Sequence, residues 1–329
     1  MATARKYFGT DGIRGEANKP PLTPEFALRL APALTKLTRE KRGKKRPQIL
    51  IGKDTRISGY MLEQALCAGF TAAGADVMLI GPAPTPAVAY LSRKHEIDLG
   101  IMISASHNPY KDNGIKIFAH DGYKLADEDE LEVEELVDAA DITNYLAAGD
   151  DIGKAFRYDG ALSEYQGYLI ETLPHKFTHA PFKAVVDCAN GAAYKVAPHL
   201  LRNIGVDVVA IHNEPNGKNI NEKCGATHLE SLQKAVVAEK ADIGIALDGD
   251  ADRLILTDET GKVIDGDQIM ALLARGFLKE GTLKKNTLAA TVMSNLGLEE
   301  FLKEQKIELV RTPVGDRYVV AEMKAQAIV

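Results

Sequence analysis

Two loops in this sequence carry residue types that could do chemistry. Residues 103–109 read Ile-Ser-Ala-Ser-His-Asn-Pro, and residues 247–253 read Leu-Asp-Gly-Asp-Ala-Asp-Arg. Each loop follows an apolar segment typical of a buried strand. A serine hydroxyl can act as a nucleophile, and three closely spaced carboxylates can hold a hard divalent cation that screens phosphate charge. Together the two loops suggest phosphoryl transfer.

The acidic loop carries Asp248, Asp250 and Asp252 at i, i+2 and i+4. This spacing allows three carboxylates to converge on one cation, and oxygen ligands of this kind suit Mg²⁺. A calcium-binding EF-hand loop is excluded, because its sixth position requires glycine and is here Arg253, and because the flanking segments read as strands. A second alternative, in which Asp248 is a phosphatase nucleophile, remains open.

The serine loop offers two hydroxyls, Ser104 and Ser106, ahead of Pro109. The proline ends regular structure and tightens the loop. On these residues alone, a purely structural interpretation remains open, in which both hydroxyls form turns or cap a helix.

Two further glycine-containing loops bring cations that suit phosphate. Arg14 lies in the loop of residues 9–15, and two more cations, Lys53 and Arg56, lie in residues 53–59. The second loop precedes a predicted helix, whose N-terminus favours an anion.

The composition is that of a globular protein, since 45% of the 329 residues are hydrophobic and 26% are charged. The formal net charge of −6 argues against general nucleic-acid binding, which needs a basic face. The one basic run, residues 39–46, is predicted to be a solvated loop, with a polyanion-binding patch as the alternative. His175 and His179 are four residues apart but lack an acidic partner, so they are predicted to be surface residues.

The sequence also bears on the compartment. Its first residues lack the apolar core of a signal peptide, and no apolar run reaches membrane-spanning length. Cys67, Cys188 and Cys224 are too few and too scattered for a disulfide framework. We therefore expect a cytoplasmic protein that binds neither a membrane nor nucleic acid.

Strand-like and helix-like segments alternate along nearly the whole chain, which indicates α/β domains with sheets covered on both faces. Thr23 followed by Pro24 predicts the start of the first helix. The alternation restarts twice, so we predict three tandem α/β/α units with mixed, mostly parallel sheets, at residues 1–158, 159–260 and 261–329. The predicted helices are 24–38, 58–74, 127–140, 193–204, 229–240, 268–278 and 296–304, and the predicted strands are 48–52, 76–80, 98–103, 182–187, 206–211, 243–247, 254–257, 287–292 and 307–311.

Seven motifs, in order along the chain, resemble the α-D-phosphohexomutase family. Two of them, the opening FGTDGIRG and the form ISASHNP, are similar to the branch of the family that acts on glucosamine phosphates rather than glucose or mannose phosphates. The resemblance covers the whole chain and is highly specific. The motifs are FGTDGIRG (8–15), GKDTRISG (52–59), ISASHNPYKDNGIKIF (103–118), CANGAA (188–193), PNGKNINEKCGATH (215–228), LDGDADR (247–253) and TPVGDRYV (312–319).

The resemblance implies roles for both chemical loops. The serine directly before His-Asn-Pro carries the phosphoryl group in this family, which implies Ser106 rather than Ser104. Asp248, Asp250 and Asp252 are implied to bind Mg²⁺, with an oxygen of Ser106 as the fourth protein ligand.

Further site residues follow from family position. Lys116 and Arg14 are implied to lie beside the transferring phosphoryl group, and Lys116 is our candidate for the base that activates the serine. His107 and Arg253 are implied to contact phosphate in the same site. Where the mannose-type enzymes carry histidine after the glycine of a Thr-x-x-Gly motif, this chain has Asp316, which leaves the general acid/base open.

The implied reaction interconverts glucosamine 6-phosphate and glucosamine 1-phosphate through a bisphosphate intermediate, on the route to UDP-N-acetylglucosamine and cell wall. The alternatives are a mutase for glucose or mannose phosphates and a non-catalytic phosphosugar-binding fragment. We expect a kinase or a bisphosphate sugar to phosphorylate Ser106. The oligomeric state is open, and a homodimer is one option.

The end of the sequence raises a further expectation. The third unit stops at Val329 without closing strands, and the family's sugar-selecting loop and fourth domain have no counterpart here. That domain clamps the distal phosphate of the substrate. We therefore expect a C-terminally truncated chain, with an incomplete third unit and poor activity.

Overall fold

The structure is a computed structural model that describes residues 5–139, 141–173 and 181–328. The predictions for His175 and His179 fall outside the described residues. The chain forms two compact units, Met1–Gly261 and Lys262–Val329.

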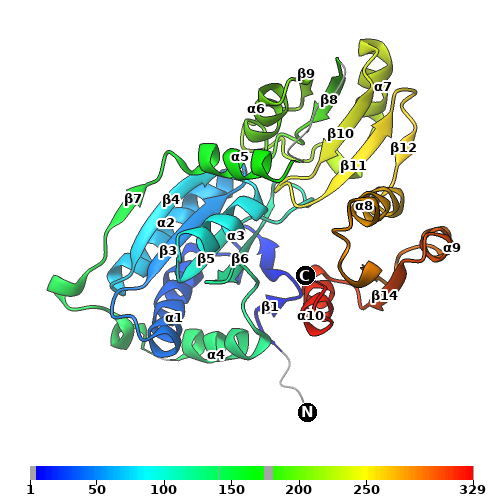
Figure 1. Ribbon diagram of the computed structural model, residues 1–329. Coiled ribbons are helices and arrows are strands. Elements are labelled where there is room, and N and C mark those ends of the chain that lie inside the picture. The colour runs from blue at the N-terminus through cyan, green and yellow to red at the C-terminus, as the bar shows by residue number, and fades with distance from the viewer. Residues whose placement is uncertain (1–4, 140, 174–180, 329) are drawn as a thin grey trace. The chain divides into compact units, whose positions relative to one another are not determined.

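A seven-stranded mixed sheet organises the N-terminal part of the first unit (Figure 1). Its order is β1-β2-β6-β5-β3-β4-β7, with parallel pairing from β5 to β7 and antiparallel pairing from β1 to β5. Because β3, β4 and β5 are parallel, the loops that follow them emerge at one edge of the sheet, where ligands bind in such folds. The strands are β1 (Phe8–Gly9), β2 (Gly12–Glu16), β3 (Gln48–Lys53), β4 (Asp76–Pro82), β5 (Leu99–Ile103), β6 (Asp112–Ala119) and β7 (Ala155–Arg157).

Helices cover both faces of this sheet (Figure 1). Ile49 and Ile51 of β3 pack into the core under α1, α2 and α4, whereas Leu50 packs into the core under α3 and α5. This alternation is the two-residue period of a strand buried on both faces. The helices are α1 (Pro24–Arg42), α2 (Ile57–Ala72), α3 (Thr85–Lys94), α4 (Asp127–Asp138) and α5 (Ala161–Glu171), with short 3₁₀ turns η1 (Ile142–Tyr145) and η2 (Gly149–Asp151).

A second mixed sheet follows within the same unit. Within the first unit, the strands of this sheet have the order β11-β10-β8-β9. Strands β10, β8 and β9 pair in parallel, and β11 pairs antiparallel with β10. Ala184 and Val186 pack towards α6, and Val185 packs towards α7. The elements are β8 (Lys183–Asp187), α6 (Val196–Asn203), β9 (Asp207–Ile211), η3 (Gly225–Thr227), α7 (Glu230–Glu239), β10 (Ile243–Leu247) and β11 (Leu254–Asp258).

The second unit is a smaller α/β arrangement around the parallel pair β13 and β14. Asp265 caps its first helix in a reciprocal capping box with Gln268. Its hydrophobic core is small, and centres on a cluster of the buried side chains Ala274, Leu298, Leu302 and Ile307. The elements are β12 (Val263–Ile264), α8 (Gly266–Glu280), η4 (Lys284–Asn286), β13 (Thr287–Thr291), α9 (Leu296–Glu304), β14 (Glu308–Thr312) and α10 (Asp316–Ala325).

The predicted elements are all present, with ends displaced by a few residues, and the mixed α/β sheets confirm the predicted fold class. Thr23 caps α1 as predicted, since its side chain accepts a hydrogen bond from the amide of Phe26. One loop prediction was wrong, because residues 9–15 form most of the β1–β2 hairpin. Helix α3, which begins at Thr85, was not among the predicted elements.

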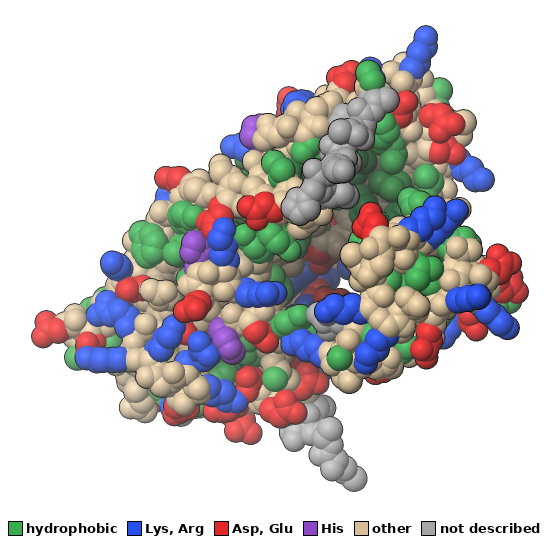
Figure 2. Space-filling view, in the orientation of Figure 1, with side chains coloured by type: hydrophobic (Ala, Val, Ile, Leu, Met, Phe, Trp, Pro, Cys, Tyr) green, Lys and Arg blue, Asp and Glu red, His purple; other side chains and the backbone are tan. Residues whose placement is uncertain are grey.

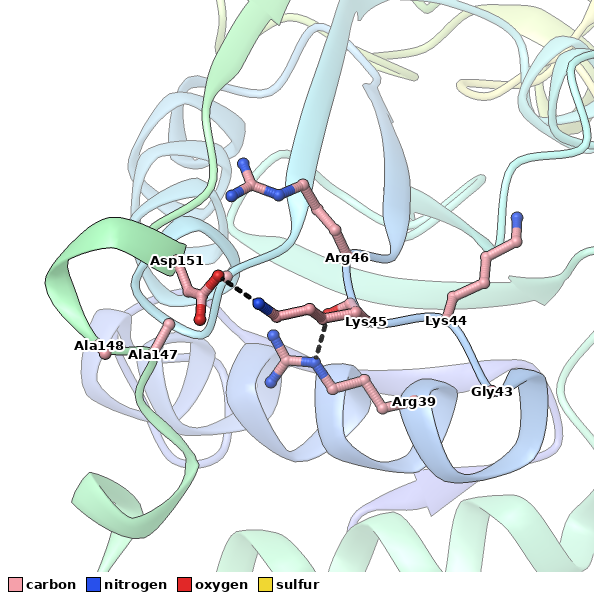
Figure 3. A pocket seen from close by; sticks show the side chains of 9 residues that line it. Arg39, Gly43, Lys44, Lys45, Arg46, Ala147, Ala148 and Asp151 are labelled. Carbon is pink, nitrogen blue, oxygen red and sulfur yellow. Dashed lines mark hydrogen bonds and ion pairs between the residues drawn. The ribbon is translucent and has the colours of Figure 1, made fainter.

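The basic run of residues 39–46 lies at the end of α1 and in the loop that follows (Figure 3). Lys45 points towards Asp151 and forms an ion pair at 2.8 Å, whereas Lys44 points away. Lys44 instead pairs with Asp98 at 2.9 Å. These pairs offset the positive charge and favour the solvated-loop interpretation over a polyanion-binding patch.

Surface charge elsewhere is mixed in the same way. On the face drawn in Figure 2, basic and acidic side chains are interspersed rather than gathered by sign. Among the described residues, no helix is long and apolar enough to span a membrane.

Candidate active site

The serine loop leaves the first sheet between two antiparallel strands, β5 and β6. Ser106 is fully buried and adopts a left-handed φ of 51°. Its amide donates to Ser104 Oγ at 2.9 Å, which places the two predicted hydroxyls in different roles. Ser104 braces the loop, and the strained residue is Ser106; such strain is typical of functional positions.

The acidic loop leaves the second sheet between β10 and β11, so the strand flanks that exclude a calcium-binding EF-hand are confirmed. One carboxylate oxygen from each of Asp248, Asp250 and Asp252 lies within 4.8 Å of the other two. Asp248 and Asp250 are buried, whereas the side chain of Asp252 is 29% exposed. A cation could therefore enter from the side of Asp252.

The two loops meet directly. Ser106 Oγ donates a hydrogen bond to Asp248 Oδ2 at 2.5 Å. Gly249 allows this approach, because a Cβ at that position would lie 2.5 Å from the carbonyl oxygen of Ser106. The predicted nucleophile and the predicted metal ligands therefore belong to one site.

The electrostatics of the carboxylates fit a divalent cation. Burial and the charges of Asp250 and Asp252 raise the pKa of Asp248 to about 7. Asp250 Oδ1 is buried and makes no hydrogen bond within the described part of the chain. Hard cations take such unpartnered carboxylate oxygens as ligands, so the donor set fits Mg²⁺.

Lys116 of β6 lies against the same carboxylates. Its Nζ is 2.7 Å from Asp250 Oδ2 and 3.1 Å from Asp252 Oδ2. Burial opposes its charge, but the carboxylates of Asp250, Asp252 and Asp11 outweigh burial and raise the pKa of Lys116 above its ordinary value. An ammonium held among these carboxylates can neutralise the charge of a transferring phosphoryl group. The role of Lys116 as the base that activates the serine stays a prediction.

The other predicted phosphate-binding residues surround this centre. Arg14 pairs with Asp11, whose Oδ2 also lies 3.2 Å from the Lys116 ammonium. Arg253 Nε is 3.6 Å from Asp252 Oδ1, with half of its side chain exposed. Burial and the charges of Arg253 and Arg14 lower the pKa of His107, which places His107 among the same cations.

Arg56 has a different role from the phosphate contact predicted for residues 53–59. It is fully buried and donates to Asp54 Oδ2 at 2.8 Å. Its Nη2 donates to the carbonyl oxygens of Ser106 at 2.8 Å and Asn108 at 2.9 Å. Lys53 is buried as well, in an ion pair with Glu63. Arg56 thus supports the serine loop from behind, and Lys53 is occupied by a residue of α2; neither cation is free to face a ligand.

Two more supporting residues were missed in the sequence. Asn221, which follows β9 in the chain, donates its amide to the carbonyl oxygens of Ser106 at 2.8 Å and Asn108 at 3.1 Å. Thr85 at the start of α3 donates to Asp250 Oδ2 at 2.5 Å. Each contact joins segments more than a hundred residues apart, so local spacing gave no signal for it.

Three consecutive family matches cover most of the chain. Residues 5–143 match the family described as phosphoglucomutase/phosphomannomutase, alpha/beta/alpha domain I, residues 163–261 match domain II, and residues 265–329 match domain III. Together with the paired serine and acidic loops, these matches define a phosphohexomutase.

Similar proteins narrow this class. Phosphoglucosamine mutase of Agrobacterium fabrum is 57% identical over 321 residues, which are 98% of this chain and 71% of that protein. The chain therefore belongs to the phosphoglucosamine mutase family, whose members are isomerases. It spans about 70% of the length of the relatives that it matches.

Solved structures agree with the fold. A phosphoglucomutase/phosphomannomutase family protein from Burkholderia thailandensis superposes with a TM-score of 0.84 at 25% identity, over 99% of this chain and 70% of that one. N-acetylphosphoglucosamine mutase of Aspergillus fumigatus, solved with GlcNAc-6P and magnesium, gives a TM-score of 0.60 at 18% identity, over 98% of this chain and 65% of that one.

Proposed function

We propose that this chain carries the phosphoserine and the metal-binding residues of a mutase that interconverts glucosamine 6-phosphate and glucosamine 1-phosphate. The observation that carries the proposal is the 2.5 Å hydrogen bond from Ser106 Oγ to Asp248 Oδ2. It joins a nucleophile to a cluster of carboxylates suited to a cation, the combination that phosphoryl transfer requires. The relatives named phosphoglucosamine mutase support the choice of sugar.

Each residue of the site has a part in the proposed cycle. Phosphorylated Ser106 gives its phosphoryl group to a hydroxyl of the bound sugar phosphate, and the bisphosphate then reorients and returns its other phosphoryl group to the serine. Lys116 and Arg14 neutralise charge on the equatorial oxygens during transfer, and His107 and Arg253 hold the phosphate from the open side.

Asp248, Asp250, Asp252 and a Ser106 oxygen would hold Mg²⁺, which supplies further neutralisation of charge on the transferring group when it is bound. The unpartnered oxygen of Asp250 makes this residue the best one to change. We expect Asp250→Asn to weaken Mg²⁺ binding and to abolish transfer. Calorimetric titration with Mg²⁺ checks the first effect, and unchanged affinity would contradict the ligand assignment.

The proposal has consequences beyond the site. It places the protein in the cytoplasm, on the route to UDP-N-acetylglucosamine and cell wall. A kinase or a bisphosphate sugar supplies the first phosphoryl group, and a homodimer is compatible with the proposal. The division into units 1–158, 159–260 and 261–329 stays a prediction.

The decisive experiment locates the covalent phosphate. Incubation with glucose 1,6-bisphosphate should add the mass of one phosphoryl group to the protein, and phosphopeptide mapping should place it on Ser106. Ser106→Ala should abolish the addition, whereas the matched variant Ser104→Ala should retain it. A phosphate on Ser104, or none at all, would overturn the proposal.

The choice of sugar needs a separate measurement. The protein should convert glucosamine 6-phosphate faster than glucose or mannose phosphates, by at least about tenfold in kcat/KM, a difference of about 1.4 kcal/mol in transition-state binding. Equal or faster turnover of glucose or mannose phosphate would assign a different substrate to the same phosphoserine site.

A further inference from the structure

A second group of metal-ligating side chains lies at one edge of the second sheet. Asp187 ends β8, His212 directly follows β9, and Cys224 immediately precedes η3. One ligand atom from each lies within 4.8 Å of the other two. Because β8 and β9 are parallel, this is the edge at which their carboxyl ends meet, where such sheets bind ligands.

The contact between Asp187 and His212 has the spacing of two ligands on one cation. His212 Nδ1 lies 3.0 Å from Asp187 Oδ2, yet this buried nitrogen makes no aligned hydrogen bond to any described residue. Two ligand atoms about 2.0–2.1 Å from a tetrahedral zinc ion lie about 3.3 Å apart. The pair is therefore close to the separation that a shared metal ion imposes.

Neighbouring backbone groups fix the orientation of these side chains. Asp187 Oδ1 accepts from the amide of Ala189 at 2.8 Å, and Oδ2 accepts from the amide of Gly225 at 2.9 Å. The second bond ties the residue after Cys224 to the carboxylate. Outer hydrogen bonds of this kind orient metal ligands and leave carboxylate lone pairs for the ion.

Two of these three side chains are buried and the third is partly exposed, which would let a metal ion enter. Asp187 and Cys224 are fully buried, whereas 30% of the His212 side chain is exposed. An ion could enter past the imidazole and keep water as a fourth ligand there.

We propose that Asp187, His212 and Cys224 form a second metal site that binds Zn²⁺. Thiolate and imidazole ligands favour such a borderline-soft ion, whereas Mg²⁺ favours the all-oxygen set of the acidic loop. This site is independent of the proposed function, since none of its three residues takes part in the phosphoryl transfer described above.

Binding requires the loss of a proton from the thiol. Burial and the charge of Asp187 raise the pKa of Cys224 to about 12, so this thiol stays protonated and unreactive until a metal ion displaces its proton. The interaction with Asp187 also raises the pKa of His212, so a proton and the metal ion compete for the imidazole.

The site lies directly behind the acidic loop. A Cβ on Gly225 would be 2.6 Å from the carbonyl oxygen of Leu247, the residue before Asp248. The amide of Ala192, a few residues after Asp187, donates to the carbonyl of Gly249 at 2.8 Å.

Cadmium provides a direct test, because Cd²⁺ replaces Zn²⁺ at thiolate sites and a cadmium–thiolate bond absorbs in the ultraviolet. The protein, reduced and freed of metal, is titrated with Cd²⁺ while Mg²⁺ in large excess occupies the acidic loop, since Mg²⁺ does not bind thiolates. We expect a charge-transfer band that saturates at one equivalent and disappears when Zn²⁺ is added.

Three variants make the test specific. Cys224→Ser should abolish the band, and Cys188→Ser, a buried control one residue from Asp187, should retain it. His212→Asn should weaken Zn²⁺ binding at least about tenfold, and asparagine suits the positive φ of 46° at this position.

The His212→Asn variant keeps the test valid if Cys224→Ser does not fold. Absence of a band in the unchanged protein, a band that persists in Cys224→Ser, or unaltered Zn²⁺ affinity in His212→Asn would overturn the proposal.

Discussion

At the scale of single residues, Arg56 determines the position of the serine loop more than any predicted catalytic residue does. Its guanidinium binds the buried carboxylate of Asp54 and the carbonyl oxygens of Ser106 and Asn108. A planar fork with five N–H donors can satisfy all of these acceptors at once, and a lysine ammonium cannot. Together with the amide of Asn221, this side chain holds the left-handed backbone of Ser106 through its carbonyl oxygen.

We therefore expect Arg56→Gln to destabilise the protein by about 3–5 kcal/mol, because it leaves Asp54 buried without a counter-charge. Arg56→Lys should lose less stability but still slow phosphoserine formation. Urea unfolding and intact mass after treatment with the bisphosphate sugar measure the two effects. Arg157→Gln, which removes an exposed ion pair with Asp159, is the control and should change stability by less than about 0.5 kcal/mol. Equal effects of Arg56→Gln and the control would contradict the role given to Arg56.

The three aspartates stand out in the sequence by their type, their spacing and their place after an apolar strand. The choice of Ser106 over Ser104 came from the family resemblance alone, and the catalytic roles of these residues stay predictions. The residues that support the two loops were not predictable. Arg56 was predicted to face phosphate, because cations at a helix start commonly do. Its burial follows from the ion pair with Asp54, two residues earlier, and from its contacts with a loop about fifty residues away. The second set of contacts leaves no local signature in the sequence.

At the scale of elements, the close approach of two loops depends on the absence of a side chain. Gly249 has no Cβ, and one placed there would lie 2.5 Å from the Ser106 carbonyl oxygen and 2.8 Å from Asn221 Nδ2. The methyl group would push the acidic loop away from the serine loop, and a displacement of about 1 Å can lower a rate about 100-fold.

We expect Gly249→Ala to reduce phosphoryl transfer by about this factor, with circular dichroism unchanged. The control is Gly167→Ala on α5, where a Cβ meets no atom within 4 Å and transfer should be unaffected. Transfer at the original rate in Gly249→Ala would show that the two loops need not meet so closely.

Helices α3 and α5 are joined by a charge cluster centred on Glu164. Lys94 lies 2.9 Å and His95 3.0 Å from its carboxylate. Burial opposes the charge, but hydrogen bonds from Lys94, Tyr158 and His95 outweigh it and lower the pKa of Glu164 to about 2. The pKa of Glu164 in the folded protein thus lies below its ordinary value of 4.5. The cluster therefore contributes its full stabilisation above pH 4.5, and this stabilisation is lost as the pH falls towards 2.

Glu164→Gln should therefore lower stability by about 0.5–1 kcal/mol at neutral pH, and the difference from the unchanged protein should shrink as the pH falls from 4.5 towards 2. Urea unfolding at neutral pH and at a pH between these two values measures it. Glu171→Gln, at the exposed end of the same helix, should show no such dependence. A difference that grows on acidification would have the wrong sign for this cluster.

The fold was predictable wherever an element is long and periodic. The first helix was recognised by its N-cap, Thr23, and the buried strands were recognised by their runs of hydrophobic residues. The β1–β2 hairpin does not, because it is short and rich in glycine, and β2 is defined by its antiparallel pairing with β6 about a hundred residues later. Helix α3 was not recognised because prolines lie on both sides of Thr85, although Pro86 lies in the first turn of the helix, where proline is tolerated.

At the scale of the whole molecule, the two units differ in how much they bury. The first sheet has cores on both faces, whereas the second unit packs one small core against two paired strands. The free energy needed to unfold a region locally increases with the apolar surface that the region buries. In a protein of residues 1–329 we expect the amides of β13 and β14 to exchange with solvent well before those of β3 and β5, as hydrogen-exchange mass spectrometry would measure. Equal protection of the two sheets would contradict this order.

The burial of Ser106 has a consequence for how the protein first acquires its phosphate. A protein kinase needs the acceptor residue and its neighbours in an extended, accessible conformation. Here the hydroxyl is fully buried, and Arg56 and Asn221 hold its carbonyl group from two sides. If Ser106 carries the phosphate, as we propose, a kinase would have to pull this loop out of the folded protein, whereas a bisphosphate sugar is small enough to reach the site with less rearrangement. Of the two donors proposed above, the enclosed loop favours the small molecule, so the first phosphorylation is expected to depend on the supply of a metabolite rather than on a signalling protein.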